Sequence, residues 1–179
     1  MKIISAPAGL SGEPLAELKQ WLAITTSSDD TLLVDLIGAA HAMCERFTGL
    51  VAYKSEVRER FAATGLDYAL GVQPVLYFID AKAIDHGLGE RLLTEDEAGF
   101  ERTGNDSGKL TLSASIPEPQ IEARYYAGLS DEWAMVEEGL RHGIIRYAAH
   151  QYRERDAGPS EAPPAAVAAL WRPYRRMRL

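Results

Sequence analysis

The side chains best suited to metal or thiol chemistry in this sequence lie together at 41–45. His41 and Glu45 are four residues apart, which places them on one face of a helix, and Cys44, the only cysteine, lies beside them. The zincin motif needs two histidines around a glutamate, and that pattern is absent. Cys44 falls on the apolar side of the expected helix, where a buried structural thiol is the more common role. We therefore predict no metal, no cofactor and no catalytic residue, and keep a small metal protein or enzyme built on these three side chains as a rival hypothesis.

A glycine-rich stretch at 104–109 approaches the pattern of a phosphate-binding loop. Gly104 and Gly108 have one residue too few between them, and Leu110 stands where a serine or threonine would bind the metal ion. The residues that follow alternate as in a strand, whereas a phosphate-binding loop opens a helix. We interpret the stretch as a hairpin turn.

Arginine and aromatic side chains alternate at the end of the chain. Residues 172–179 contain four arginines and no acid, although the whole chain has a net charge of -7. Guanidinium groups pair with carboxylates and phosphates, and Trp, Tyr and Arg are enriched at binding hot spots. The candidate binding residues are Trp171, Arg172, Tyr174, Arg175, Arg176, Arg178 and Leu179. We predict that they belong to an arm that binds a partner, because a merely solvated end needs no tryptophan, tyrosine or leucine.

Length and composition narrow the class of protein. A chain of 179 residues with 46% apolar and 25% charged residues is typical of one globular domain. Its overall acidity argues against a general nucleic-acid coat, which needs a basic surface. No apolar run approaches the roughly 18 residues that cross a bilayer, and the N-terminus has no stretch of signal-peptide length. We expect a protein that is made in the cytoplasm and has no membrane partner.

Apolar residues recur with a helical period in the first and last thirds of the chain. This periodicity predicts three main helices, at 14–23, 29–47 and 130–156, and a short helix over 165–171. Pro14 suits the first turn of a helix, Gly49 a helix end, and Ser130 an N-cap. The first ten residues are expected to form an extended arm.

Between the second and third helices the period changes to two. Short alternating runs separated by Gly, Asp and Pro predict a small antiparallel sheet of about five strands within 51–126. We therefore predict an α+β fold in which a helical bundle carries an inserted small sheet. The expected body covers 1–156, and a linker with an extended C-terminal arm covers 157–179.

Several stretches, taken in order, resemble the head–tail connector (adaptor) family of long-tailed bacteriophages and related gene transfer agents. The matching stretches are 15–22, 29–40, 44–49, 73–75, 125–128, 144–155 and 173–176. No single stretch is a catalytic motif, and the resemblance rests on their order and spacing along nearly the full chain.

The resemblance implies a non-enzymatic structural virion protein. In that family about a dozen copies form a ring that joins the portal to the stopper or tail and continues the DNA channel. The helical bundle makes lateral contacts between copies, and the C-terminal extension docks onto the portal. The arginine and aromatic residues at 171–179 would then be portal contacts, and DNA would pass without sequence-specific binding. The location would be the neck of the virion, after synthesis in the cytoplasm of the bacterial host.

A second reading of the same residues is a small nucleic-acid-binding module that grips phosphates with the arginine-rich tail. The acidity of the remaining chain favours the ring with a DNA channel over this second reading. Acidic residues that line a channel repel phosphate and let DNA slide through it.

Overall fold

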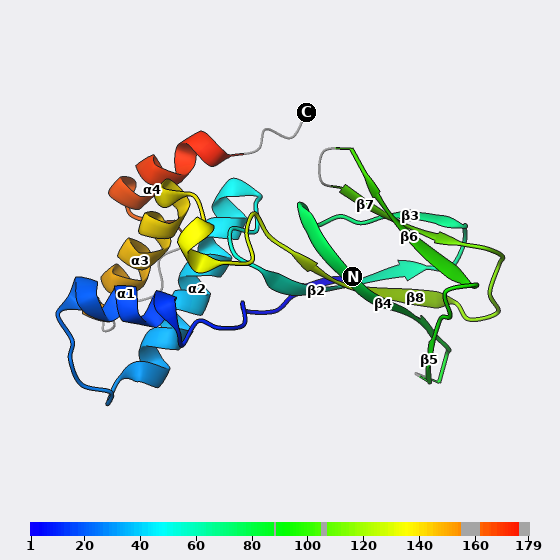
Figure 1. The fold of residues 1–179 in the computed structure, drawn as a ribbon, viewed down its shortest axis with the longest axis horizontal. Coiled ribbons are helices and arrows are strands. Elements are labelled where there is room, and N and C mark those ends of the chain that lie inside the picture. The colour runs from blue at the N-terminus through cyan, green and yellow to red at the C-terminus, as the bar shows by residue number, and fades with distance from the viewer. Residues whose placement is uncertain (88, 105–106, 155–161, 176–179) are drawn as a thin grey trace. The chain divides into compact units, whose positions relative to one another are not determined.

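The chain divides into a β unit and a helical unit, which we describe separately. The computed structural model describes residues 1–87, 89–104, 107–154 and 162–175. The β unit contains Met1–Ser5 and Lys54–Gly128, and the helical unit contains Ala6–Tyr53 and Leu129–Leu179 (Figure 1). Each unit is therefore assembled from segments that are far apart in the sequence.

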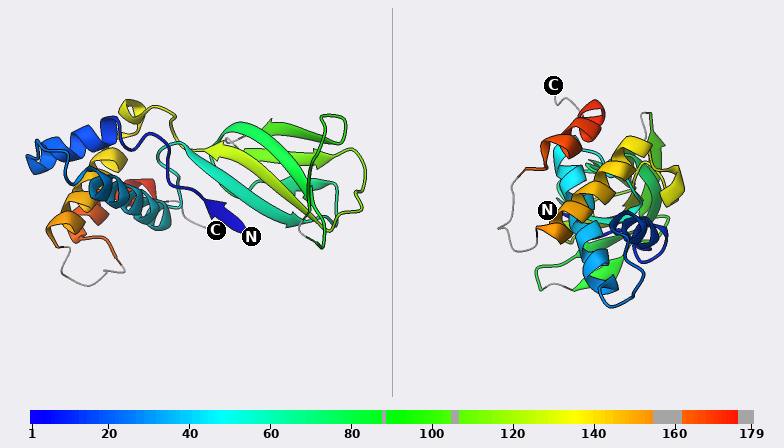
Figure 2. Two further views of the ribbon diagram at one scale, coloured as in Figure 1. Left: turned by 90° about the horizontal axis from the view of Figure 1, so that it is seen from below. Right: turned by 90° about the vertical axis from the view of Figure 1, so that its left-hand side faces the viewer.

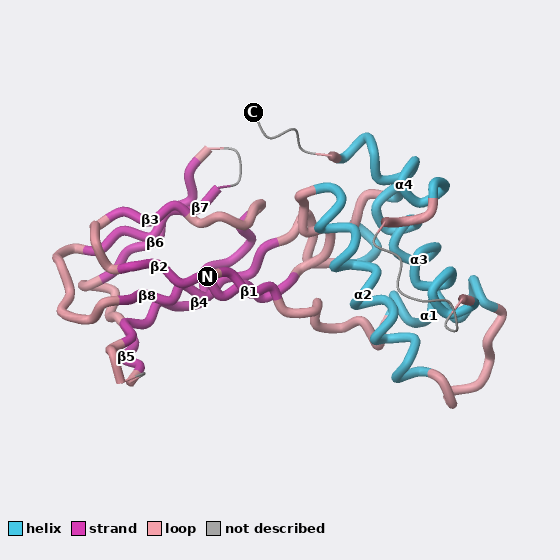
Figure 3. Tube along the Cα trace, turned by 180° about the vertical axis from the view of Figure 1, so that it is seen from behind, coloured by secondary structure: helices cyan, strands magenta, loops and turns pink. Residues whose placement is uncertain are grey.

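Two antiparallel sheets make up the β unit (Figures 1 and 3). The larger has the order β1-β2-β8-β4-β5, with β1 at Lys2–Ile4, β2 at Ser55–Ala62, β8 at Gln120–Ala127, β4 at Val75–Ile84 and β5 at Glu90–Leu92. The smaller has the order β3-β7-β6, with β3 at Asp67–Ala69, β7 at Ser107–Leu112 and β6 at Ala98–Thr103. The prediction of one small sheet is thus corrected to two.

The N-terminal strand was not expected from the sequence. Lys2–Ile4 pairs with the middle of β2, and the terminal amine of Met1 donates to the carbonyl of Arg60 at 3.0 Å. The backbone here is extended, as predicted, but the segment is paired with β2 and is not a separate arm. The hairpin predicted near Gly104 is confirmed by the pairing of Thr103 with Ser107 between β6 and β7.

Alternating side chains from both sheets form the core of the β unit. Val57 and Tyr125 of the larger sheet and Leu110 of the smaller sheet are fully shielded from solvent. Phe78 of β4 stacks on Phe100 of β6, with ring centroids 4.8 Å apart. The strands of the two sheets therefore pack face to face, as Figure 2 (left) shows.

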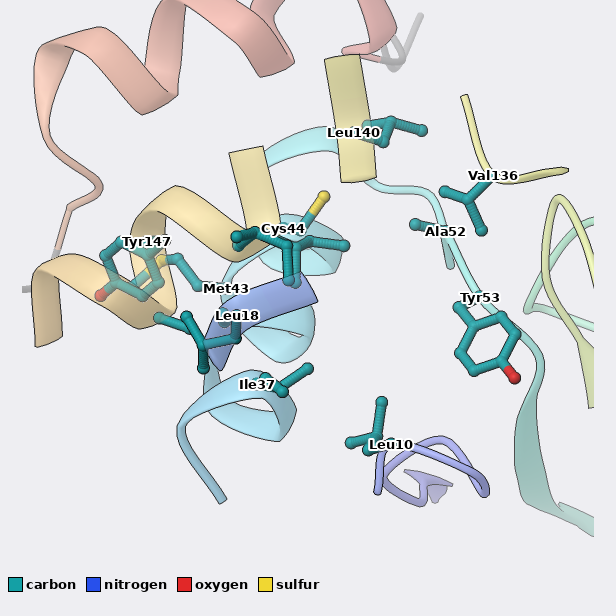
Figure 4. Packing of buried hydrophobic residues seen from close by; sticks show 14 of the residues in the cluster. Leu10, Leu18, Ile37, Met43, Cys44, Ala52, Tyr53, Val136, Leu140 and Tyr147 are labelled. Atoms are coloured by element: carbon teal, nitrogen blue, oxygen red, sulfur yellow. The ribbon is translucent and has the colours of Figure 1, made fainter. Parts of the chain in front are cut away.

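The helical unit consists of four α-helices and two single 3-10 turns within its described residues. They are α1 at Glu13–Leu22, α2 at Asp30–Thr48, η1 at Trp133–Met135, α3 at Glu138–Arg153, α4 at Ala165–Trp171 and η2 at Arg172–Tyr174. The apolar faces of α1, α2 and α3 meet in one core that includes Leu18, Ile37, Cys44 and Leu140 (Figure 4). None of the described helices is both long enough and apolar enough to span a membrane.

The α+β class and the first two predicted helices are confirmed, but the third helix begins later than predicted. The hydroxyl of Ser130 does accept from the backbone N–H of Glu132, yet it closes a local turn rather than capping a long helix. The chain is extended at Val136, with φ -63° and ψ 133°, and α3 starts only at Glu138. The indole of Trp133 instead donates to the carboxylate of Glu17 at 2.8 Å, which ties this turn to α1. Residues 155–156, the predicted end of this helix, lie outside the described residues.

Candidate partner-binding surface at the C-terminus

The segment that carries the aromatic and arginine side chains folds against the helical unit, and α4 lies beside α3 (Figures 1 and 3). Trp171, the last residue of α4, is 0% exposed, and its Nε1 donates to the carbonyl oxygen of Leu140 at 3.3 Å. The rings of Phe47 and Tyr147 lie near the indole, with centroid distances of 6.0 Å and 6.1 Å. Trp171 is therefore a core residue that holds α4 on the bundle.

Two glycines of α3 make room for this segment. A Cβ atom at Gly143 would lie 2.1 Å from Nε1 of Trp171 and 2.7 Å from its Cδ1. A Cβ atom at Gly139, one turn earlier, would lie 2.8 Å from the hydroxyl of Tyr174. The indole sits so close to the helix backbone that only glycine fits at 143. We call this contact the Gly143 notch.

The arginines that follow Trp171 point away from the core. Arg172 and Arg175 are exposed, and neither forms an ion pair within the part of the chain that the structure describes. The guanidinium carbon of Arg175 lies 5.6 Å from the ring centroid of Phe47, a cation–π geometry. Tyr174, which lies between these arginines in the sequence, is half-buried. These two guanidinium groups are therefore free to pair with an external anion.

The structure thus separates the predicted binding residues. Trp171 was predicted to contact a partner, whereas its indole is buried inside the same chain because the Gly143 notch accepts it. Arg172, Tyr174 and Arg175 retain accessible surface. The remaining predicted residues, Arg176, Arg178 and Leu179, and the linker at 157–161 lie outside the described residues. The sequence analysis did not identify the surface of α3 on which Trp171 packs. Gly139 and Gly143, four residues apart on one helix face, were a usable signal for it.

His41 and Cys44, the candidates for metal or thiol chemistry, are both buried in the core of the helical unit. His41 is 3% exposed, and its Nε2 accepts a hydrogen bond from the backbone N–H of Tyr53 at 3.1 Å. Burial lowers the pKa of His41 to about 4 and raises the pKa of the Cys44 thiol to about 12. Among the described residues, no group of three or more His, Cys, Asp or Glu side chains is placed to hold a metal ion.

One buried carboxylate in the β unit belongs to a polar network. Glu59 of β2 is 9% exposed and accepts from the hydroxyl of Tyr125 and from the backbone N–H of Gly71, both at 2.8 Å. The same hydroxyl accepts from the backbone N–H of Val72 at 3.2 Å. Burial and the neighbouring carboxylate raise the pKa of Tyr125, so it stays protonated as a donor. The network ties the 71–72 segment to the larger sheet.

The cations of the larger sheet are already paired with carboxylates. Every lysine and arginine of β2, β4, β5 and β8 lies within 4 Å of a carboxylate oxygen. Arg60 bonds to Glu122 at 2.7 Å, and the bond from Arg124 lowers the pKa of Asp80. These five cations therefore offer little uncompensated positive charge to a phosphate backbone.

No protein-family model and no curated protein sequence matches this chain. Solved structures match it along its whole length. One chain from the "Neck of empty GTA particle computed with C6 symmetry", where GTA denotes a gene transfer agent, has a TM-score of 0.72 at 21% identity. One from the "Neck of native GTA particle computed with C12 symmetry" has a TM-score of 0.69 at 22% identity. Each match covers 100% of this chain and 97% of the other, so the predicted resemblance is confirmed at the level of the fold.

Proposed function

We propose that this chain is a non-enzymatic structural protein of a virion neck: an adaptor ring that joins the portal to the stopper or tail. The observation that carries the proposal is the full-length fold match to chains of gene transfer agent necks. The C12 symmetry of one of those necks supports a ring of identical copies, and a closed ring needs head-to-tail contacts between them. The ring would surround the path of the DNA, in a phage or a gene transfer agent assembled in the bacterial host.

The outer side of α2 supports contacts between copies. Leu32 is 41% exposed, Ala39 and Ala42 are also exposed, and Leu36 is half-buried. A helix that is apolar on more than one side suits burial on both. We place the neighbouring copy of the ring on this face. The mass of the purified protein, alone and with portal, tests the ring directly: a protein that stays monomeric in both samples contradicts it.

The body at 1–156 would form the ring, and 157–179 would attach it to the portal. Deleting 158–179 is a poor test, because it also removes Trp171 and Val167 from the core. Reversing the charge of surface arginines is sharper. We expect Arg172→Glu with Arg175→Glu to abolish portal binding, while reversal of the exposed Arg46 and Arg153 leaves it unchanged. Equal binding by both double variants would overturn the attachment.

The nucleic-acid-binding alternative makes a different prediction. Four arginines that neutralise phosphates give a slope of about -3.6 for log K against log salt concentration. Filter binding of duplex and single-stranded DNA at low and moderate salt measures this slope. The adaptor proposal expects weak binding without such a slope, and tight binding with it favours the alternative.

A further inference from the structure

The buried tryptophan and the exposed arginines are adjacent in the chain, which couples their positions. Trp171 ends α4, Arg172 opens η2, and Arg175 follows as the C-cap of that turn. The backbone N–H of Arg175 donates to the carbonyl of Arg172 at 3.3 Å, so the two arginines share one hydrogen-bonded turn. Whatever fixes Trp171 therefore also fixes the start of the cationic tail.

The contact that fixes Trp171 is unusually specific for a short helix. α4 has only seven residues and no side-chain cap, so its position depends on what it packs against. Val167 and Trp171 are its buried side chains, and the indole reaches the backbone of α3 at the Gly143 notch. Tyr174 packs one turn earlier on the same helix, at Gly139. A single bulky anchor with a glycine beneath it sets the docked position.

We propose that Trp171 is a positioning residue, which presents Arg172 and Arg175 at a fixed place on the helical unit to a carboxylate-rich protein surface. This inference rests on the proposed function and identifies the partner surface of the portal by its chemistry. A free arm loses conformational entropy when it binds. A segment that is already docked avoids most of this cost, so its affinity is higher without any new contact. The half-buried Tyr174, which lies between these arginines in the sequence, also suits a protein surface, where an aromatic edge meets apolar atoms.

Gly143→Ala tests the positioning role because it changes no exposed side chain. The added methyl group displaces the indole, so the full-length variant keeps both arginines but no longer holds them in a fixed position on the helical unit. Gly38→Ala in α2 is the matched control, because its Cβ would make an ordinary contact at 3.7 Å from Leu10. Trp171→Ala removes the anchor without adding an atom, and it serves as the second route if Gly143→Ala does not fold by circular dichroism.

Two measurements are needed. The first is the affinity of each full-length variant for purified portal. We expect at least a tenfold loss for Gly143→Ala and Trp171→Ala, and a change of less than twofold for Gly38→Ala. The second is the 19F spectrum of protein labelled with 5-fluorotryptophan, in which the Trp171 signal should become solvent-accessible in Gly143→Ala only.

The outcomes separate the inference from the proposed function. If the wild-type chain does not bind portal, the proposed function fails, whereas the fluorine spectrum still tests the docked position by itself. If Gly143→Ala exposes Trp171 and binds portal as tightly as the wild type, the positioning role is overturned. A Trp171 signal that stays buried in Gly143→Ala overturns the notch. Loss of DNA binding but not of portal binding in the Arg172→Glu, Arg175→Glu variant overturns the carboxylate surface as partner.

Discussion

His41 should make the stability of the helical unit depend on pH. Its imidazole is buried, and burial lowers its pKa from 6.5 to about 4. Nε2 must stay unprotonated to accept the hydrogen bond from the backbone of Tyr53. Protonation in the folded state would therefore both charge a buried ring and break this bond. The substitution that isolates the effect is His41→Gln, because a glutamine carbonyl can accept the same bond and does not titrate.

The sign and size follow from the two pKa values. Below pH 6.5 the unfolded chain binds a proton at His41 that the folded chain does not bind, so acid favours unfolding. The contribution is complete above pH 6.5 and is lost as the pH falls towards the folded pKa of about 4. The expected loss is about 1 kcal/mol at pH 5.5 and roughly 2 to 3 kcal/mol at pH 4.5.

Urea unfolding followed by tryptophan fluorescence measures this loss of stability. The signal reports on the helical unit, because Trp21, Trp133 and Trp171 all belong to it. Carboxylates titrate in both proteins and cancel when wild type and His41→Gln are compared at each pH. The wild type should be the more stable at pH 7.5, and its advantage should shrink by roughly 2 to 3 kcal/mol by pH 4.5. An advantage that is the same at both pH values would refute a neutral, buried His41.

Three further predictions concern single side chains. Tyr125→Phe leaves the buried Glu59 with one donor fewer, so it should lower the free energy of unfolding by about 1–3 kcal/mol in urea titrations. Cys44, buried and with its pKa raised to about 12, should not react with a thiol reagent at pH 8 until urea unfolds the chain, and prompt reaction in the folded state would contradict its burial. Asp80→Asn weakens the pair with Arg124, which is partly exposed, so the cost should be about 0.5–1 kcal/mol and nearly independent of pH between 6 and 8.

Local pattern was sufficient where a helix carries its own start and end signals. The second predicted helix and α2 agree to within one residue because acidic residues begin it and Gly49, with φ 76°, ends it. The start of α3 was mispredicted although Ser130 is a good cap residue. A serine hydroxyl can accept from a backbone N–H in a turn as well as in the first turn of a helix. Here the turn forms, and the bond from Trp133 to Glu17, 116 residues away in the sequence, holds it against α1.

The binding surface was less accessible to sequence reasoning than the fold. Trp171 and the arginines were found because their types are unusual together, but nothing local reveals which surface an aromatic ring packs on. The notch depends on the crossing of α3 and α4, and hence on the whole bundle. The strand at Lys2–Ile4 was missed for a similar reason, because three residues carry almost no periodicity and their pairing partner lies more than 50 residues away.

Ion pairs within the chain restrict where the described part of this acidic protein can offer positive charge to a partner. In the larger sheet, carboxylates hold every lysine and arginine of β2, β4, β5 and β8, and in the helical unit Asp30 holds Lys19 at 2.6 Å. Arg172 and Arg175 have no such carboxylate among the described residues. At the turn that Trp171 anchors, an anionic partner meets two exposed guanidinium groups close together in the chain, whereas at these strands it would first have to displace a carboxylate. The net charge of -7 weakens long-range attraction to any anion, so recognition at this turn must depend on close, well-positioned guanidinium contacts. The burial of Trp171 against α3 supplies that positioning, because it fixes the turn that carries both arginines.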